Sequence, residues 1–389
     1  MTAFFSRPVC RNIGAGHPTF FTGGNERCGM SDDETDGSAR VVGSSEVEPD
    51  RHDHGRRAFR QYRLGHAAGG DDLGTSRYEL DPGDRTWPAH YHTANEEAVH
   101  VLDGELTLWV GNLDRRTAVS LEPGDYAALP TGPDHTHEVE SAGDGTARFL
   151  VVSTMREPDF TVLDGPGDRR KAHLVAGDPP GEYDGRYVSR TLDFDAEVPY
   201  WEADGGEAGS ETDSENGRED SEETAAVERH VVSAGDLDWS EHGPPREGHR
   251  FRRKQLGAAA GGEDLGASLY EVPPGKRTWL PHYHTGNEEA IYVLAGEGTI
   301  TLGPDRVERS LSPGDYAALP AGEAGYHDIV AGSETFRYLL VSTMNEPDVT
   351  VYPEDDRVGL YAGSAPGGDG AARSLSTYLD SDAEVDYWE

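Results

Sequence analysis

The sequence predicts an all-β protein in which one domain of antiparallel strands occurs twice. The first observation behind this prediction is a repeat. "HYHTANEEAVHVLDGE" at residues 90–105 returns 192 positions later as "HYHTGNEEAIYVLAGE" at residues 282–297, and 12 of the 16 letters are identical. "GDYAALP" is found at 124–130 and at 314–320, and each copy ends in "YWE". The repeated unit is roughly 150 residues long, which is the size of one domain.

The second observation is the local pattern within each copy. Segments such as "EAVHVL", "ELTLWV", "GTITL" and "FRYLLV" are short and rich in β-branched and aromatic residues, as strands are. Turn sequences such as "DPGD", "PPGK", "EPGD" and "SPGD" separate them at short intervals. No long stretch shows helical periodicity. This spacing favours a sandwich or a barrel of antiparallel strands.

Changes in composition divide the chain into four parts. Residues 203–227 have almost no apolar content and many like charges, so they are predicted to be an acidic, disordered linker. Residues 1–56 are predicted to be a disordered or acidic N-terminal extension. The two copies of the domain then occupy residues 57–202 and residues 228–389.

The first 29 residues differ in charge from the acidic stretch that begins at Met30. We interpret residues 1–29 as disordered, or as an upstream extension of a chain whose biological start is Met30. Cys10 and Cys28 are the only cysteines, and nothing repeats around them, so an incidental pair is the favoured interpretation over a disulfide or a metal site.

The charge balance is extreme: 73 acidic residues face 34 basic ones, and the formal net charge is −39. An acidic, lysine-poor chain of this kind is typical of a cytoplasmic protein from a salt-accumulating halophile, such as a halophilic archaeon. Nucleic acid is not an expected partner, because binding phosphates requires a basic face. A membrane is not expected either, since no apolar run approaches the length that spans one.

The repeat contains candidate metal ligands. His90 and His92 stand at positions i and i+2, so on a strand both rings point to one face. Glu97 follows after a turn, at the start of the next predicted strand. These side chains can therefore converge inside a barrel. The second copy repeats the set as His282, His284 and Glu289.

A third imidazole must come from later in each copy, and the first copy offers His135 and His137. The second copy decides between them. An alignment without gaps places Gly325 opposite His135 and His327 opposite His137. A ligand that both sites need is therefore His137 in the first copy and His327 in the second, and His135 is incidental.

The same comparison sets aside His100 and His173, which face a tyrosine and a glycine in the second copy. Glu96 and Glu288 each adjoin a candidate ligand. Strand alternation sends them to the opposite face, so we interpret them as surface groups or as groups that support the ligands from behind.

Arginine and tryptophan precede the paired histidines in both copies, as Arg85, Trp87, Arg277 and Trp279. The arginines could bind an anionic substrate, but salt bridges on an acidic surface are the favoured interpretation. Four repeated tyrosines are expected in the core, namely Tyr78, Tyr126, Tyr270 and Tyr316.

This pattern resembles the cupin superfamily. Its first motif places a glycine, His-x-His, a glutamate and a second glycine at fixed intervals, and here reads Gly83, His90, His92, Glu97, Gly104 and Gly275, His282, His284, Glu289, Gly296. Its second motif reads Gly124, Pro130, Gly132, His137 and Gly314, Pro320, Gly322, His327. The first gap is six residues instead of five, the second-motif histidine follows after four residues instead of two, and the final asparagine of the motif is missing.

The resemblance covers nearly all of residues 57–202 and 246–389, and the "STM-x-EPD" tail looks like that of uncharacterised prokaryotic cupins. It implies two tandem double-stranded β-helix (jelly-roll) barrels, a bicupin. Three neutral imidazoles and one carboxylate leave open positions on a divalent transition metal, so we expect one Mn, Fe, Zn, Ni or Co ion in each barrel. The expected ligands are His90, His92, Glu97 and His137, and His282, His284, Glu289 and His327.

Function follows less directly from a fold that hosts many chemistries. We expect a metal-dependent enzyme that acts on a small polar molecule, with a dioxygenase favoured. The alternatives are a sugar or sugar-phosphate isomerase, a carboxylate decarboxylase, or a protein that binds a small ligand without catalysis. The expected partner is a small-molecule ligand or substrate, and a homodimer is possible.

Overall fold

The structure is a computed structural model that describes residues 40–164, 169–177, 188–193, 196, 230–243 and 246–388. The described part is almost entirely β-structure, which confirms the predicted fold class. Its helical elements are short, and comprise α1 (Leu64–Ala67), α3 (Leu256–Ala259) and the 3-10 turns η1 (Pro133–His135) and η4 (Glu323–Gly325). None of the helices among these residues is both long and apolar enough to cross a membrane.

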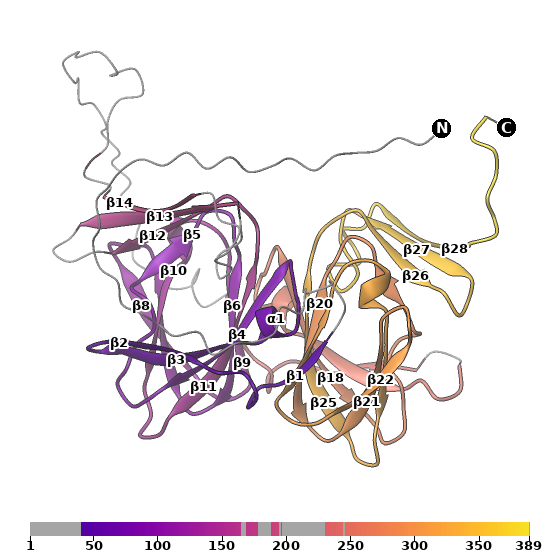
Figure 1. The fold of residues 1–389 in the computed structure, drawn as a ribbon, viewed down its shortest axis with the longest axis horizontal. Helices are drawn as coiled ribbons and strands as arrows, with labels where there is room; N and C mark the ends of the chain where they lie inside the picture. Colours follow the sequence, from indigo (N-terminus) through magenta and orange to yellow (C-terminus); the bar gives the residue numbers. More distant parts are fainter. Residues whose placement is uncertain are drawn as a thin grey trace, which may run out of the picture. The chain divides into compact units, whose positions relative to one another are not determined.

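The first half of the protein, from β2 to β14, contains two sheets that form one jelly-roll domain (Figure 1). One sheet has the strand order β15-β9-β6-β11-β4-β3-β2 and the other β14-β13-β12-β5-β10-β7-β8. The strands of this half are β2 (Asp50–His54), β3 (Arg57–Arg63), β4 (Leu73–Leu80), β5 (His90–His92), β6 (Glu97–Asp103), β7 (Leu106–Gly111), β8 (Arg116–Leu121), β9 (Asp125–Leu129), β10 (Thr136–Ser141), β11 (Ala147–Thr154), β12 (Asp159–Asp164), β13 (Arg170–Ala176) and β14 (Val188–Asp193).

The second half, from β16 to β28, repeats this arrangement. One sheet has the order β1-β23-β20-β25-β18-β17-β16, and facing strands form the sets β19-β26-β27-β28 and β22-β21-β24. The strands are β16 (Ser240–His242), β17 (Phe251–Gln255), β18 (Leu265–Val272), β19 (Tyr283–His284), β20 (Glu289–Ala295), β21 (Gly298–Leu302), β22 (Val307–Leu311), β23 (Asp315–Leu319), β24 (His327–Ala331), β25 (Phe336–Thr343), β26 (Asp348–Tyr352), β27 (Arg357–Ala362) and β28 (Leu375–Asp380).

The two halves exchange their first strands. β1 (Val41–Gly43) precedes the first half in sequence but pairs antiparallel with β23 of the second half, where it lies as a short indigo arrow (Figure 1). β15 (Val231–Ser233) precedes the second half and pairs in the same way with β9 of the first half. Each half therefore completes one sheet with a strand that comes from the other half's side of the sequence.

The positions of β1 and β2 differ from the expectation for the N-terminal residues. Residues 1–56 were predicted to be a disordered or acidic extension, but β1 and β2 lie within them. Short, partly exposed strands of this kind carry too few apolar residues for sequence periodicity to reveal them. Residues 1–39 and the predicted linker 203–227 lie outside the described residues.

The central strands of each half are buried on both faces. Along β6, Val99 and Val101 point into the core of the first half. Ala98, on the opposite face of the same strand, belongs to a core cluster that both halves share. Because successive side chains of a strand alternate between faces, a residue next to a cavity-facing ligand points into the contact between the halves. The four repeated tyrosines are buried as expected, namely Tyr78, Tyr126, Tyr270 and Tyr316.

The shared core cluster includes the short helices α1 and α3 and strand residues of both halves. Leu64, Ala68 and Leu73 of the first half have counterparts in Leu256, Ala260 and Leu265 of the second, and all six are buried. Such burial provides the main favourable free energy that holds two halves together.

Two buried glutamates connect the halves reciprocally. Glu288 Oε2 of the second half accepts hydrogen bonds from the backbone N–H groups of Asp71 and Asp72, with N···O distances of 2.9 and 2.6 Å. Glu96 Oε2 of the first half accepts those of Glu263 and Asp264, at 2.8 and 2.5 Å. The glutamates do face away from the ligands, as predicted, but the surface interpretation is wrong, because that face is covered by the other half.

Burial raises the pKa of both carboxyl groups to about 7, despite the N–H donors that favour the charged form. We call the hydrogen bonds of Glu96 and Glu288 to backbone N–H groups of the other half the cross-half clamps. Gly70 and Gly262 let the carboxylates approach, since a Cβ added there would lie 2.5 and 2.8 Å from a carboxylate oxygen.

Candidate metal centre

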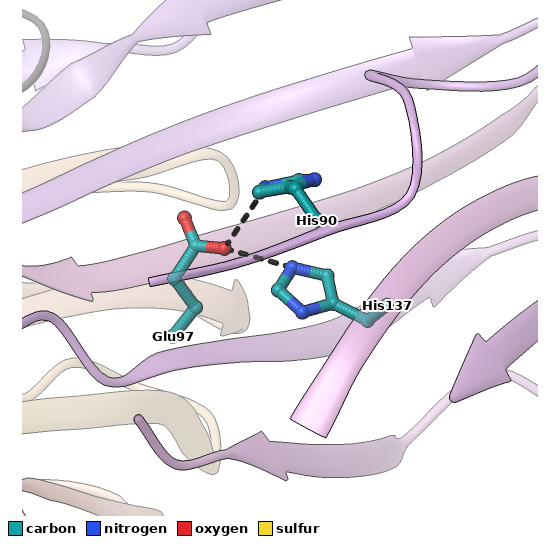
Figure 2. Close-up of side chains that lie close together, drawn as sticks. All are labelled: His90, Glu97 and His137. Atoms are coloured by element: carbon teal, nitrogen blue, oxygen red, sulfur yellow. Dashed lines mark hydrogen bonds and ion pairs between the residues drawn. The ribbon is translucent and has the colours of Figure 1, made fainter. Parts of the chain in front are cut away.

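In the first half, strands β5, β6 and β10 bring three imidazoles and one carboxylate together. Glu97 Oε2 lies 2.9 Å from His137 Nε2, 3.7 Å from His92 Nε2 and 3.8 Å from His90 Nε2. Figure 2 shows the rings of His90 and His137 both facing the same oxygen of the Glu97 carboxylate. Register explains the convergence, because His137 of β10 stands directly opposite His90 of β5.

The second half repeats the cluster with β19, β20 and β24. His284 Nε2 lies 3.8 Å from Glu289 Oε1, and His327 Nε2 lies 3.5 Å from Glu289 Oε2. The ring centroid of His282 is 5.1 Å from that of His284 and 4.4 Å from that of His327. The structure therefore brings together all the residues that the sequence nominated in each copy.

Each imidazole is oriented through its other nitrogen by an acceptor outside the cluster. In the first half, Nδ1 of His90, His92 and His137 lies 2.7 Å from Pro88 O, 2.5 Å from Asp159 Oδ2 and 3.0 Å from His135 O. Carbonyl and carboxylate oxygens only accept hydrogen bonds, so each Nδ1 carries a proton. Each Nε2 is left to face Glu97, and His137 Nε2 is within hydrogen-bond distance of the Glu97 carboxylate.

In the second half, the histidines make the equivalent hydrogen bonds. Nδ1 of His282, His284 and His327 lies 2.7 Å from Leu280 O, 2.6 Å from Asp348 Oδ2 and 3.0 Å from Gly325 O. Sequence reasoning missed Asp159 and Asp348, which hold the second histidine of each pair. The signal was present, since both are the aspartate of the repeated "EPD" tail and both are buried.

The donor set fits a divalent transition metal. Ligand atoms bound to one ion at about 2.1 Å lie between about 3 and 4 Å from one another, and the measured separations fall in this range. Three imidazole nitrogens and a carboxylate that face a common point can all bind one cation placed between them, and the negative charge of the carboxylate attracts it. Glu289 Oε2 is buried and has no hydrogen-bond partner among the described residues, as expected for an atom whose partner is an ion.

The electrostatics of the first cluster also favour a cation. Burial lowers the pKa of His90 to about 3, and His137 adds to this effect. Burial alone would also lower the pKa of His92, but the charge of Glu97 and the hydrogen bond to Asp159 outweigh it and raise the pKa. The pKa of Glu97 lies well below its ordinary value, because the imidazoles, His92 foremost, outweigh the cost of its burial. The carboxylate is therefore charged at neutral pH.

The other predicted residues stand outside both clusters. His135 contributes its carbonyl to His137 and stacks its ring edgewise on His230, at 4.8 Å between centroids. His100 is buried between the halves, with Nδ1 3.1 Å from Asp125 O. Neither ring belongs to a cluster, so the prediction that they are not ligands is consistent with their positions.

The arginines that precede the histidines form salt bridges. Arg85 binds Glu138 and Glu140 through its two terminal nitrogens, at 3.1 and 2.7 Å, and Arg277 binds Asp328. The favoured interpretation of these arginines is thus confirmed, and neither directs its guanidinium to a cluster.

The first cluster opens into a cavity of about 850 Å³. Most of its walls are apolar. The apolar residues are Val99, Leu129, Val139, Phe149, Val151, Leu163 and Val175, together with the rings of Tyr78 and Trp87. Polar side chains line the cavity as well, among them Gln61, Arg63, His66, Asp71, Ser76, Ser153 and Ser189. Pockets of 300–1,000 Å³ with such walls suit molecules of drug size.

In the second half, larger side chains stand at the equivalent wall positions. Tyr352, Tyr361 and Tyr378 occupy the sheet positions that Leu163, Val175 and Thr191 have in the first half. The Tyr352 ring stacks on the ligand His282, with 5.6 Å between centroids, and Tyr361 Oη donates to Tyr378 Oη at 2.8 Å. The space in front of the second cluster is thereby narrowed.

His173, which the sequence comparison set aside, lines the first cavity. The comparison rejects any residue that the copies do not share. That criterion suits ligands present in both sites, but it cannot find a residue that serves one site alone. Gly359 occupies the equivalent position in the second half.

Fold and clusters together define a protein with two jelly-roll domains, each with a histidine–glutamate site. The chain accordingly contains two cupin domains, a bicupin arrangement, because the family described as "Cupin domain" matches residues 76–153 and 268–342. These two matches include every ligand candidate.

Among curated proteins, the chain is similar to quercetin 2,3-dioxygenase of Bacillus subtilis (strain 168), with 27% identity over 264 residues, 67% of this chain and 71% of that protein. Among solved structures, it is similar to a deletion mutant of Bacillus subtilis oxalate decarboxylase, with a TM-score of 0.50, 16% identity, and coverage of 83% of this chain and 82% of that chain. A structure of the same decarboxylase concerned with its Mn(II) centres gives a TM-score of 0.50 and 16% identity, over 82% and 81% of the two chains. The structural likeness shows the fold.

Proposed function

We propose that the first half is the active site of a metal-dependent, dioxygenase-type enzyme, in which His90, His92, Glu97 and His137 hold one divalent transition metal. The observation that supports this proposal is the position of the cluster on the wall of a cavity of about 850 Å³. In the same proposal, the second cluster holds a second ion behind the tyrosines, through His282, His284, Glu289 and His327.

When bound, a redox-active divalent ion supplies Lewis acidity and open coordination positions, on which dioxygenase chemistry depends. The side chains of the protein orient the ligands and bind the substrate. Asp159 fixes the tautomer and the ring orientation of His92. The apolar walls bind the body of a substrate and exclude water, which strengthens electrostatic interactions at the cluster. Trp87 and Tyr78 supply aromatic surface there, held together by a hydrogen bond of 3.3 Å.

The cavity favours a substrate with an apolar, oxygen-bearing body over a small dicarboxylate or a sugar phosphate. A molecule of a few heavy atoms leaves most of about 850 Å³ unfilled and pairs poorly with aliphatic walls. A sugar phosphate calls for basic groups. Arg63 is the arginine in the cavity lining, and it pairs with Asp50, while Arg85 pairs with two glutamates. Similarity to a quercetin dioxygenase at 27% identity supports the same choice.

Elemental analysis combined with oxygen uptake tests this proposal. The full chain, purified in high salt, is analysed for metals and then assayed with quercetin, catechols, β-diketones and hydroxybenzoates. We expect close to two ions per chain and oxygen consumption that a chelator abolishes and the same metal restores. Full metal content without oxygen uptake on any substrate contradicts the dioxygenase assignment. Ligand binding without turnover would then favour a binding protein.

A further inference from the structure

A strip of polar residues crosses one wall of the first cavity. His92 of β5 stands opposite Thr161 of β12, Thr161 opposite His173 of β13, and His173 opposite Thr191 of β14. Directly opposed residues on neighbouring strands project from the same face of the sheet. All four line the cavity, and we call them the polar strip.

The polar strip runs away from the metal cluster. Neighbouring strands lie about 4.8 Å apart, so His173 is about 10 Å from His92 along the sheet. Thr161 Oγ1 lies 3.3 Å from His92 Nδ1, and His173 Nδ1 lies 3.0 Å from Thr191 Oγ1. The strip therefore has two hydrogen-bonded pairs, one at the cluster and one at the far end.

The second half keeps only the pair at the cluster. Thr350 Oγ1 lies 3.2 Å from His284 Nδ1, as Thr161 does from His92. We call His173 and Thr191 the far pair. In the second half, Gly359 and Tyr378 stand at their positions. A second cluster of the same geometry forms without His173 and Thr191, so the far pair is not needed to build the cluster.

The composition of the wall around the far pair adds to this argument. Leu163 of β12 and Val175 of β13 are apolar and line the same cavity, together with the polar Ser189 of β14. Thr191 is exposed, so the pair lies at the outer end of the cavity. A polar pair beside apolar wall residues can fix the orientation of a bound ligand, because it gives the ligand a defined point for a hydrogen bond. An imidazole donates or accepts according to its tautomer, so it can bind either a hydroxyl or a carbonyl oxygen.

We propose that His173 and Thr191 bind an oxygen at the far end of the substrate and so determine its length. This inference rests on the proposed function, in which the near end of the substrate carries oxygens at the metal. It assigns the substrate to elongated, oxygenated aromatic compounds that have polar groups at both ends, about 10 Å apart, and an apolar middle. A single-ring catechol reaches the cluster but not the far pair.

Anaerobic binding measurements test this inference separately from turnover. Dissociation constants of quercetin, which has oxygens at both ends, and of catechol are measured by calorimetry on the metal-loaded full chain. The variants are His173→Val, which suits a strand but removes the polarity, and His173→Gln, which retains hydrogen bonding. His54→Val changes an exposed histidine of β2 and is the matched control.

We expect His173→Val to weaken quercetin binding about tenfold, the effect of one or two lost hydrogen bonds. Catechol binding and metal content are expected to stay unchanged. His173→Gln should recover part of the loss, and His54→Val should bind like the wild type. The inference is overturned if both ligands weaken equally, if metal is lost with His173→Val, or if the wild type binds quercetin no more tightly than catechol. Selective binding of quercetin without oxygen uptake would instead refute the proposed function and leave the role of His173 standing.

Discussion

The two halves have matching histidine–glutamate clusters and different walls in front of them. In each, three imidazoles face a glutamate and each Nδ1 is held by an equivalent acceptor. The first cluster opens into a cavity of about 850 Å³. In the second half, the Tyr352 ring covers His282 instead. The comparison teaches that the two copies share the side chains of the cluster and differ in the side chains that shape the approach to it.

The largest expected effect comes from removing one ligand in either half. His92→Ala and His284→Ala are matched variants, and each should lower the metal content from two ions to one per chain. Only His92→Ala should abolish oxygen uptake, by about a hundredfold or more, because only the first cluster adjoins the large cavity. Metal analysis and oxygen uptake on the same preparations check this. Equal loss of activity in both variants would contradict the division of roles.

The aspartates behind the ligands should have the next largest effect. Asp159→Asn and Asp348→Asn each exchange a charged acceptor for a neutral amide. Loss of such an outer partner lowers metal affinity by about 10–100-fold. Competition with a chelator, measured separately for each variant, gives the affinities. An unchanged affinity at both sites would show that Pro88 O and the other carbonyl acceptors suffice to orient the rings.

Exchanging wall residues between the halves should have an intermediate effect. Leu163→Tyr places the residue of the second half over His90, and should weaken quercetin binding about tenfold by filling the cavity. Metal content should not change, since no ligand is altered. Tyr352→Leu is the reciprocal variant and should open the second site. If Leu163→Tyr binds quercetin like the wild type, the tyrosines do not account for the difference between the halves.

The cross-half clamps should have the smallest effect on substrate binding, although their effect on stability is larger. Glu288→Ala leaves the buried N–H groups of Asp71 and Asp72 without an acceptor, which costs about 1–3 kcal/mol of stability per group. Denaturant titration of wild type, Glu288→Ala and the matched Glu96→Ala measures the loss. Asp71 also lines the first cavity, so Glu288→Ala, a change in the second half, should weaken quercetin binding in the first more than Glu96→Ala does. The reverse order would refute this coupling.

Sequence alone predicted the clusters well, because the duplication supplied an internal comparison. His137 was chosen over His135 on that basis, and the geometry brings His137 to Glu97. The same comparison could not find His173, whose role depends on a difference between the copies. The alternation of a strand correctly turned Glu96 away from the ligands. It could not show that the opposite face is buried, since burial there depends on contacts between residues far apart in sequence.

Asp159 and the exchanged strands illustrate two further limits. Asp159 lies more than 60 residues beyond His92, and no spacing rule connects them until the fold places β12 beside β5. β1 is a three-residue strand whose partner lies more than 270 residues away. Such pairing is determined by packing, because the local sequence of β1 holds no information about its partner.

The reciprocal exchange of β1 and β15 bears on how the protein can be divided. A gene fragment that encodes the first half alone would lack β15 and leave the edge of β9 exposed, ready to pair with another chain. In a symmetric dimer of that fragment, β1 of each subunit could pair with β9 of the other subunit and cover this edge. The tandem chain thus resembles a strand-exchanged dimer whose two subunits have been joined into one chain, with β1 and β15 as the exchanged strands.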